Sequence, residues 1–239
     1  MLPYKDENPT VITPVAMIGI IVLNVLAWLF IQGAGSRVAV AASVCQLGMI
    51  PGELFGTLPI GTQVPLGPGL ACVIGAPHYA TVITSMFMHG GWFHIIGNMW
   101  FLWVFGNNIE DSMGHMRFVV FYLLCGVAAA FTQLLADPHS HVPMVGASGA
   151  ISGVLGAYIL LFPQVRIHTL VTLGFFVTTV ALPAYVMLGY WFVLQLLLGA
   201  VSRTAGGIAV WAHIGGFVAG VVLIKLFVSA ELTARHQPL

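Results

Sequence analysis

Long runs of apolar residues, separated by short polar stretches, are the strongest constraint on how this chain can fold. A helix needs roughly 20 consecutive, mostly apolar residues to cross a hydrocarbon core of about 30 Å. Of the 239 residues, 59% are apolar and only 6% are charged, and the mean hydropathy is +1.00. Because a water-soluble domain carries about a quarter charged residues, the sequence predicts a polytopic membrane protein.

Polar breaks between the apolar runs predict six membrane-spanning helices, so the expected fold class is an all-α polytopic bundle. Residues 35–90 are rich in Gly and Pro, which predicts a long first outer loop that is either ordered or interfacial. Residues 167–181 are rich in Val, Thr and Phe, and we expect them to lie at the membrane interface. Residues 1–13 and 230–239 are expected to be tails flanking a membrane domain over 14–229. The predicted spans cover residues 14–34, 92–109, 117–136, 147–162, 183–200 and 209–227.

The positions of Lys and Arg predict the orientation, because cytoplasmic loops carry an excess of these residues. With a cytoplasmic N-terminus, five of them lie inside (Lys5, Arg117, Arg166, Lys225 and Arg235) and two lie outside (Arg37 and Arg203). Six spans then return the C-terminus to the cytoplasm. The first apolar run is not followed by a small-residue cleavage site, so it is expected to be a retained helix. The short tails and the lack of a transit segment favour a bacterial inner membrane.

The charge balance bears on the partners of the protein. The formal net charge is zero and the chain has no basic tract, which argues against a nucleic-acid partner. The lipid bilayer is the expected surrounding, and the sequence does not predict an oligomeric state.

Four polar residues lie near the starts of the three helices that run inward from the outer face. His94 and Asn98 are in the second predicted span, Ser148 is in the fourth and His213 is in the sixth. Polar groups are expensive in hydrocarbon, so they tend to face the bundle interior and to mark function. His94 and Asn98 are four residues apart and share one helix face. We therefore expect all four side chains to form one site at a shallow depth on the outer side.

The chemistry that these groups predict is acyl transfer. A serine hydroxyl becomes a nucleophile when a histidine accepts its proton, which Ser148 and His213 could do as a dyad. The Ser148 N–H at a helix start, with the side chains of His94 and Asn98, would supply three donors to an oxyanion. Ser152 lies one turn deeper, and we expect it to bond back to its own helix or to allow close packing.

Four motifs, in this order, give the chain its resemblance to a known family. They are HGGWFHIIGNMWFLW at 89–103, GNNIEDSMGHMRF at 106–118, GASGA at 146–150 and AHIGGFVAG at 212–220. With these motifs the chain resembles the rhomboid intramembrane serine proteases. The resemblance implies a six-helix core and substrates that are transmembrane helices of other proteins.

The resemblance also implies a role for each matched residue. Ser148 would be the nucleophile, His213 the base, and His94 and Asn98 the oxyanion donors. Gly216 and Gly220 match a glycine pair that lets the sixth helix press against the fourth, and Glu110 with Arg117 matches a polar turn after the second. Many members carry an aromatic residue four positions after the nucleophile, where this chain has Ser152. What orients His213 is therefore left open.

Two other functions are compatible with parts of the sequence. His89, His94 and His213 could bind a metal ion, but H-E-x-x-H is absent and the first two histidines are five residues apart, so they face different directions. We therefore predict no metal and no cofactor. The second alternative is a catalytically inactive rhomboid-like protein that binds membrane helices without cutting them.

Two further expectations concern the outer side. Cys45 and Cys72 both fall in the outer loop, where either a disulfide or two free thiols would fit. A substrate helix is expected to enter from lipid past the fifth span and the SRTAGGI loop at 202–208, with Gly206 and Gly207 making that loop a lid.

Overall fold

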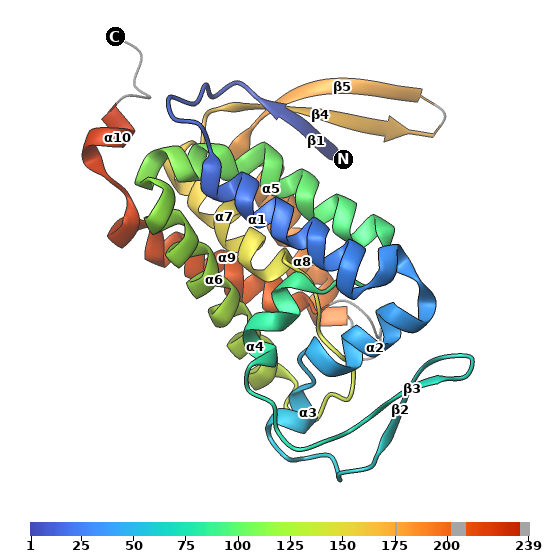
Figure 1. The fold of residues 1–239 in the computed structure, drawn as a ribbon. Helices are drawn as coiled ribbons and strands as arrows, with labels where there is room; N and C mark the ends of the chain where they lie inside the picture. The colour runs from blue at the N-terminus through green and yellow to red at the C-terminus, as the bar shows by residue number, and fades with distance from the viewer. Residues whose placement is uncertain (175, 202–208, 235–239) are drawn as a thin grey trace.

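The computed structural model describes residues 1–174, 176–201 and 209–234, and shows a helical bundle with a small sheet at each end (Figure 1). The long helices lie within the six predicted spans or extend beyond them by a few residues. They are α1 (Val15–Leu26), α5 (Trp92–Met113), α6 (His115–Ala136), α7 (Ser148–Leu161), α8 (Ala184–Val201) and α9 (Val210–Phe227). A π-helical stretch, Ala27–Ile31, continues α1.

These helices differ in length and in apolar composition. Among the described residues, α6 and α9 are both long and apolar enough to cross a bilayer, whereas the helical stretches over 15–31, 148–161 and 184–199 are apolar but shorter. The count of six membrane crossings therefore stays a prediction.

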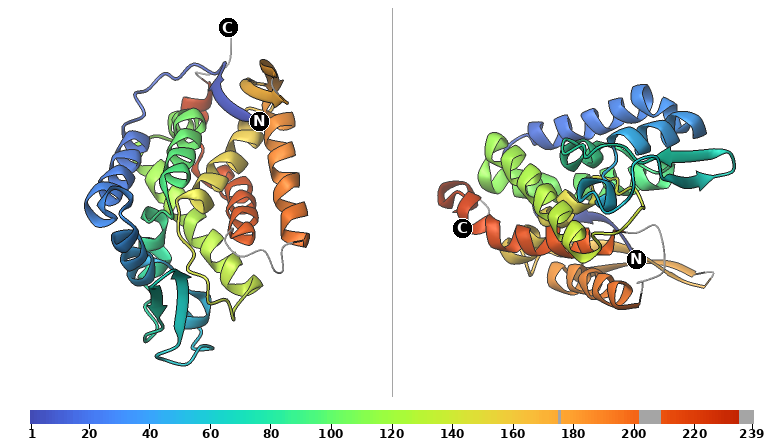
Figure 2. Two further views of the ribbon diagram at one scale, coloured as in Figure 1. Left: turned by 90° about the vertical axis from the view of Figure 1, so that its right-hand side faces the viewer. Right: turned by 90° about the horizontal axis from the view of Figure 1, so that it is seen from below.

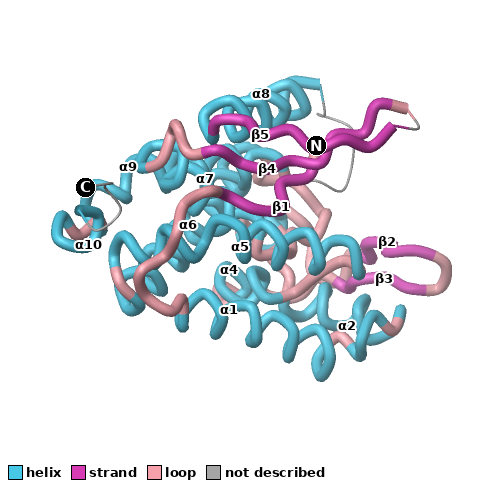
Figure 3. Tube along the Cα trace, turned by 90° about the horizontal axis from the view of Figure 1, so that it is seen from above, coloured by secondary structure: helices cyan, strands magenta, loops and turns pink. Residues whose placement is uncertain are grey.

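Helices make up most of the fold, as expected, but two small sheets depart from the all-α expectation. Within residues 167–181, which were expected at the membrane interface, the described residues form most of an antiparallel hairpin, β4 (Arg166–Leu173) and β5 (Phe176–Pro183). The N-terminal tail contributes β1 (Leu2–Asp6), which pairs antiparallel with β4 (Figure 3). The run of Val, Thr and Phe explains the hairpin, because β-branched and aromatic residues favour strands.

The predicted outer loop over residues 35–90 has regular structure of its own. It contains three short α-helices, a 3₁₀ helix over Ser85–Phe87 and a hairpin, and Figure 2 shows that the hairpin lies at the end of the bundle opposite the three-stranded sheet. A disulfide joins Cys45 to Cys72, which decides between the two states that the sequence left open. The elements of this outer segment are α2 (Arg37–Leu47), α3 (Pro51–Leu54), β2 (Gln63–Gly67), β3 (Leu70–Val73) and α4 (Thr81–Thr84).

The start of α1 is held by two adjacent carboxylates at the end of α5. Glu110 is fully buried and accepts hydrogen bonds from the backbone N–H groups of Ala16 and Met17, while Asp111 accepts those of Val11 and Ile12. The first amides of a helix have no partners within it, and negative charge is favourable there. This is the structural role of the polar turn that the sequence singled out at Glu110. The C-terminal helix α10 (Ala230–Ala234) packs near the same end of α5.

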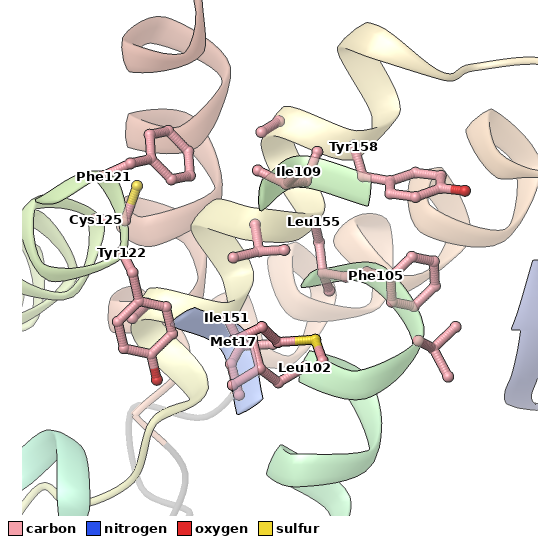
Figure 4. Packing of buried hydrophobic residues seen from close by; sticks show 14 of the residues in the cluster. Met17, Leu102, Phe105, Ile109, Phe121, Tyr122, Cys125, Ile151, Leu155 and Tyr158 are labelled. Carbon is pink, nitrogen blue, oxygen red and sulfur yellow. The ribbon is translucent and has the colours of Figure 1, made fainter. Parts of the chain in front are cut away.

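Helix α7 forms the centre of the core. Its residues from Gly149 to Tyr158 are buried, and α5, α6 and α9 surround it. Figure 4 shows Ile151 and Leu155 of α7 between the aromatic side chains of α6 and Phe105 of α5, with Tyr158 of α7 beside Phe105. Ser148 is the first residue of this central helix, so the core fixes its position.

Glycines bring α7 and α9 into backbone contact. A Cβ added to Gly216 would collide with the carbonyl oxygen of Gly149, and one added to Gly220 would collide with that of Gly153. Small residues at such positions let two helix backbones approach closely. Gly216 and Gly220, which the sequence predicted to serve helix packing, therefore lie at the contact between α7 and α9, the helices that carry Ser148 and His213.

Candidate active site

Ser148 and His213 lie at the starts of two helices that are in contact. Ser148 is the first residue of α7 and His213 is the fourth residue of α9. The distance between Ser148 Oγ and His213 Nε2 is 2.9 Å, which is a hydrogen bond. The structure thus brings together two side chains that are 65 residues apart in sequence.

His94 and Asn98 lie beside the same helix start. The backbone at Gly146 has a φ of +119°, and a Cβ there would lie 2.6 Å from His94 Nε2 and 3.4 Å from Asn98 Nδ2. Only glycine adopts such a φ readily, and only glycine leaves this space open. The chain therefore turns into α7 directly under these two side chains.

His94 and Asn98 each have a side-chain N–H donor near the open space beside Gly146. His94 Nδ1 accepts a hydrogen bond from the Gly90 N–H at 3.3 Å, so a neutral His94 carries its proton on Nε2. The Nδ2 group of Asn98 is buried and has no hydrogen-bond partner among the described residues. A buried amide without a partner is costly, and this N–H group is free to donate to a bound ligand. The backbone N–H of Ser148 is a further donor, because the first amides of a helix are unpaired within it.

Ser152 has a different environment from Ser148. Its hydroxyl donates a hydrogen bond to the Ser148 carbonyl oxygen at 2.7 Å, and its side chain is buried. Bonding back to its own helix is one of the two roles that the sequence predicted for it. Only Ser148, of these two serines, contacts the imidazole.

Helix α8 supplies a contact to His213 that sequence reasoning missed. Gln195 Oε1 lies 2.9 Å from His213 Nδ1, and the Trp191 ring lies 6.0 Å from the imidazole, centroid to centroid, in a tilted arrangement. The signal was present in the sequence, because Gln195 is an isolated amide in an otherwise apolar helix. A polar residue in such a helix generally faces a partner in the bundle.

His89 lies close to His94 but has different contacts. Its ring is fully buried, makes an edge-on contact with His94 at 5.2 Å, and has no hydrogen-bond partner for either nitrogen among the described residues. Gln32 holds the backbone of His89 through two hydrogen bonds of 2.8 Å each. In the described part of the chain, no three His, Cys, Asp or Glu side chains lie close enough to hold one metal ion.

The candidate active site opens onto one cavity of about 1700 Å³. It is lined by residues of α5, α6, α7, α8 and α9 and by the segment 137–146 that precedes α7. The four residues that the sequence selected, together with Gln195, all line it. A cavity of this size can accommodate a peptide segment. The predicted lid at 202–208 lies outside the described residues.

Comparison with known proteins adds a family match to this geometry. A model of the Rhomboid domain matches residues 76–230. The chain is 30% identical over 175 residues to RHOMBOID-like protein 5 of Arabidopsis thaliana, which covers 69% of this chain and 52% of that protein. It is 29% identical over 168 residues to Rhomboid protease GluP of Bacillus subtilis, covering 70% of this chain and 31% of the relative.

A third relative bears on the expected membrane. Rhomboid protein 1, mitochondrial, of Saccharomyces cerevisiae is 31% identical over 168 residues, covering 66% of this chain and 44% of the relative. The chain thus spans about half, or less, of the length of these three curated relatives. Because the relatives come from different compartments, they do not support the expectation of a bacterial inner membrane.

Proposed function

The chain belongs to the rhomboid family of integral membrane proteins, and from this premise we propose that it is an intramembrane serine endopeptidase. In this proposal Ser148 is the nucleophile, His213 is the general base, and the substrates are transmembrane helices of other proteins. The observation that carries the proposal is the 2.9 Å contact between Ser148 Oγ and His213 Nε2 at the wall of the cavity. A nucleophile within hydrogen-bond reach of its base is the geometric requirement for covalent catalysis.

The proposed reaction proceeds in two halves. His213 Nε2 takes the proton from Ser148 Oγ as the oxygen attacks the peptide carbonyl carbon, and then gives that proton to the leaving nitrogen as the C–N bond breaks. In the second half, water attacks the acyl-enzyme, with His213 again accepting and returning a proton. The products are a carboxylic acid, an amine and the free Ser148 hydroxyl.

Three donors would stabilise the oxyanion of each tetrahedral intermediate. They are the Ser148 N–H, the His94 Nε2–H and the Asn98 Nδ2–H groups. The close approach of Gly146 to both side chains and the unpaired Asn98 amide support this assignment. Donors fixed in place before the reaction cost no reorganisation, and removing one of them lowers kcat by roughly 100- to 1000-fold in enzymes of this kind.

We further propose that the six long helices all cross the bilayer, with the catalytic end on the outer side and both termini in the cytoplasm. The disulfide supports this orientation independently of the charges. Met49 and Met144 pair through their backbones, which links the segment after Cys45 to the loop that leads into α7. The disulfide and the site therefore lie at the same end of the bundle. Disulfides persist on the side of a membrane that faces an oxidising compartment.

The substrate must expose a carbonyl that a helix normally keeps in a hydrogen bond. A substrate helix therefore has to unwind locally before Ser148 can attack, so helix-weakening residues near the cut should favour cleavage. The resemblance to the family adds a preference for a small residue before the cut. The depth of the site near the outer face gives water access for the second half of the reaction.

The direct test uses the purified full chain in liposomes with a panel of fluorescent transmembrane helices. We expect the wild type to cleave at least one of them, and Ser148→Ala and His213→Ala to lose this cleavage. Ser152→Ala is the matched control, because the same hydroxyl is removed one turn deeper on the same helix and its bond is only to its own backbone. A serine-directed fluorophosphonate should label the wild type and Ser152→Ala but not Ser148→Ala.

Three results would each count against the proposal. Cleavage that persists in Ser148→Ala would rule out the assigned nucleophile. Cleavage that is lost on chelation would indicate metal-dependent chemistry. Tight binding of transmembrane helices with neither cleavage nor labelling of the wild type would favour the inactive rhomboid-like alternative.

A further inference from the structure

We propose that Gln195 is a positioning residue that holds His213 in the tautomer required of a base, in place of the missing aromatic residue at position 152. This inference rests on the proposed function of Ser148 and His213. Gln195 is 9% exposed, and its Oε1 lies 2.9 Å from His213 Nδ1. The two nitrogens of the imidazole are thereby both engaged, one by Gln195 and the other by Ser148.

The role of His213 depends on which of its two ring nitrogens carries the proton. A neutral histidine has one N–H donor and one lone-pair acceptor, and which nitrogen carries the proton is set by its partners. To take the Ser148 proton, His213 must present its lone pair at Nε2, so the proton must be on Nδ1. An amide oxygen can only accept, so a Gln195 Oε1 facing Nδ1 favours that form. The other tautomer would place a proton on Nε2 and prevent base catalysis.

The same contact assists the charged state that follows. Once His213 has taken the Ser148 proton, the ring is positive and both nitrogens are donors. Hydrogen bonds to charged groups are roughly twice as strong as neutral ones, so the contact to Oε1 strengthens as the charge develops. An interaction that is stronger in the transition state than in the ground state raises kcat and leaves binding of the substrate little changed.

The position of Gln195 explains how the site tolerates Ser152. Ser152 has no ring to place beside His213, and its hydroxyl is committed to the Ser148 carbonyl. Trp191 lies one turn before Gln195 on α8, so the two side chains project from one face of that helix toward His213. Helix α8 thus supplies both a ring and an acceptor, which places the orientation of the base under the control of α8 and not of α7.

The kinetic test compares two substitutions at this position. Gln195→Leu keeps much of the side-chain volume and removes the acceptor, and we expect it to lower kcat roughly 3- to 10-fold with KM within about twofold, which corresponds to the net value of one hydrogen bond. Gln195→Glu keeps an acceptor oxygen whether or not it is protonated, and we expect kcat to stay within about threefold of the wild type. Leu196→Met is the matched control, because Leu196 is the next residue of α8 and is exposed.

A second measurement separates this inference from the proposed function. Nitrogen-15 NMR of histidine-labelled protein, with His213 assigned by the signal lost in His213→Asn, should show the Nδ1–H form in the wild type and in Gln195→Glu. Gln195→Leu should show a mixture of the two tautomers. This readout needs no cleavage, so it decides the role of Gln195 even if no substrate is cut. An unchanged tautomer in Gln195→Leu, or a kcat equal to that of Leu196→Met, would overturn the inference.

Discussion

Gly216 of α9 rests directly on the carbonyl oxygen of Gly149 of α7, so the backbones of the two helices that carry His213 and Ser148 are in contact. Gly149 is adjacent to Ser148, and Gly216 is three residues beyond His213. The contact between Gly149 and Gly216 therefore lies within one helical turn of both Ser148 and His213, and it sets the distance between the Ser148 hydroxyl and the His213 imidazole. A shift of about 1 Å between reacting groups can reduce a rate by roughly 100-fold.

Gly216→Ala should both destabilise the protein and abolish cleavage. The added methyl group would collide with a backbone atom that has no alternative rotamer, so the helices must separate, at a cost of about 1–3 kcal/mol or more. The check is the thermal unfolding midpoint in detergent together with the cleavage rate. Gly189→Ala in α8 is the matched control, because a Cβ at Gly189 would meet nothing within 4 Å. Equal effects of the two substitutions would contradict the packing role.

Gly146→Ala should abolish cleavage by closing the space proposed for the oxyanion. The new Cβ would lie 2.6 Å from His94 Nε2, and the φ of +119° is one that alanine rarely adopts. We expect a loss of at least about 100-fold in kcat, as for removal of an oxyanion donor. Gly91→Ala provides the comparison, since that position has open space and an extended backbone. Full activity of Gly146→Ala would show that the reaction does not use this space.

The bond between Cys45 and Cys72 should be detectable by mass and should stabilise the outer segment. Alkylation of the unfolded chain without reductant is expected to modify only Cys125, the one free cysteine, and alkylation after reduction should modify all three. Replacing both Cys45 and Cys72 by Ala should lower the free energy of unfolding by about 2–4 kcal/mol, because the bridge restricts the unfolded chain. Modification of three cysteines without reductant would contradict the pairing.

His89 should make the folded state less stable in mild acid. It lies just before α5, and burial, assisted by the nearby His94, lowers the pKa of its imidazole from 6.5 to about 3. The unfolded chain therefore binds a proton at this residue between about pH 6.5 and pH 3 while the folded chain does not, so stability falls as the pH drops below about 6.5.

The measurement for His89 is the change in thermal midpoint between about pH 7.5 and pH 5.5. His89→Phe keeps an aromatic ring beside His94 and removes the titration, so its midpoint should fall less than that of the wild type over this interval. The comparison uses the change with pH and not the absolute stability, which the larger ring would also affect. Identical changes in the two proteins would show that His89 does not contribute.

Much of the site could be predicted from sequence because its members obey local rules. Alternation of apolar runs and polar breaks placed the helices to within a few residues, since burying an unpaired backbone in lipid leaves few other solutions. Polar residues at the starts of alternate helices then selected Ser148, His213, His94 and Asn98. The structure places all four around one cavity.

Hydropathy does not distinguish the strands of this protein from its membrane helices. Residues 167–181 are as apolar as a helix of the bundle, and their β-branched content was visible but was given too little weight. Their pairing with residues 2–6 depends on a partner more than 150 positions away, which no local pattern encodes. The disulfide was equally undecided, because whether Cys45 and Cys72 meet depends on how the segment between them folds.

The sequence by itself determined that this is a membrane protein and which side chains have the chemistry of acyl transfer, because hydropathy and side-chain type are properties of single residues and short spacings. Only the tertiary structure decided what faces the second nitrogen of His213. Gln195 is 18 residues away, on a helix whose rotation about its axis is set by packing against α9. Contacts of this kind depend on the relative placement of whole helices, which side-chain packing determines after the local patterns have been satisfied.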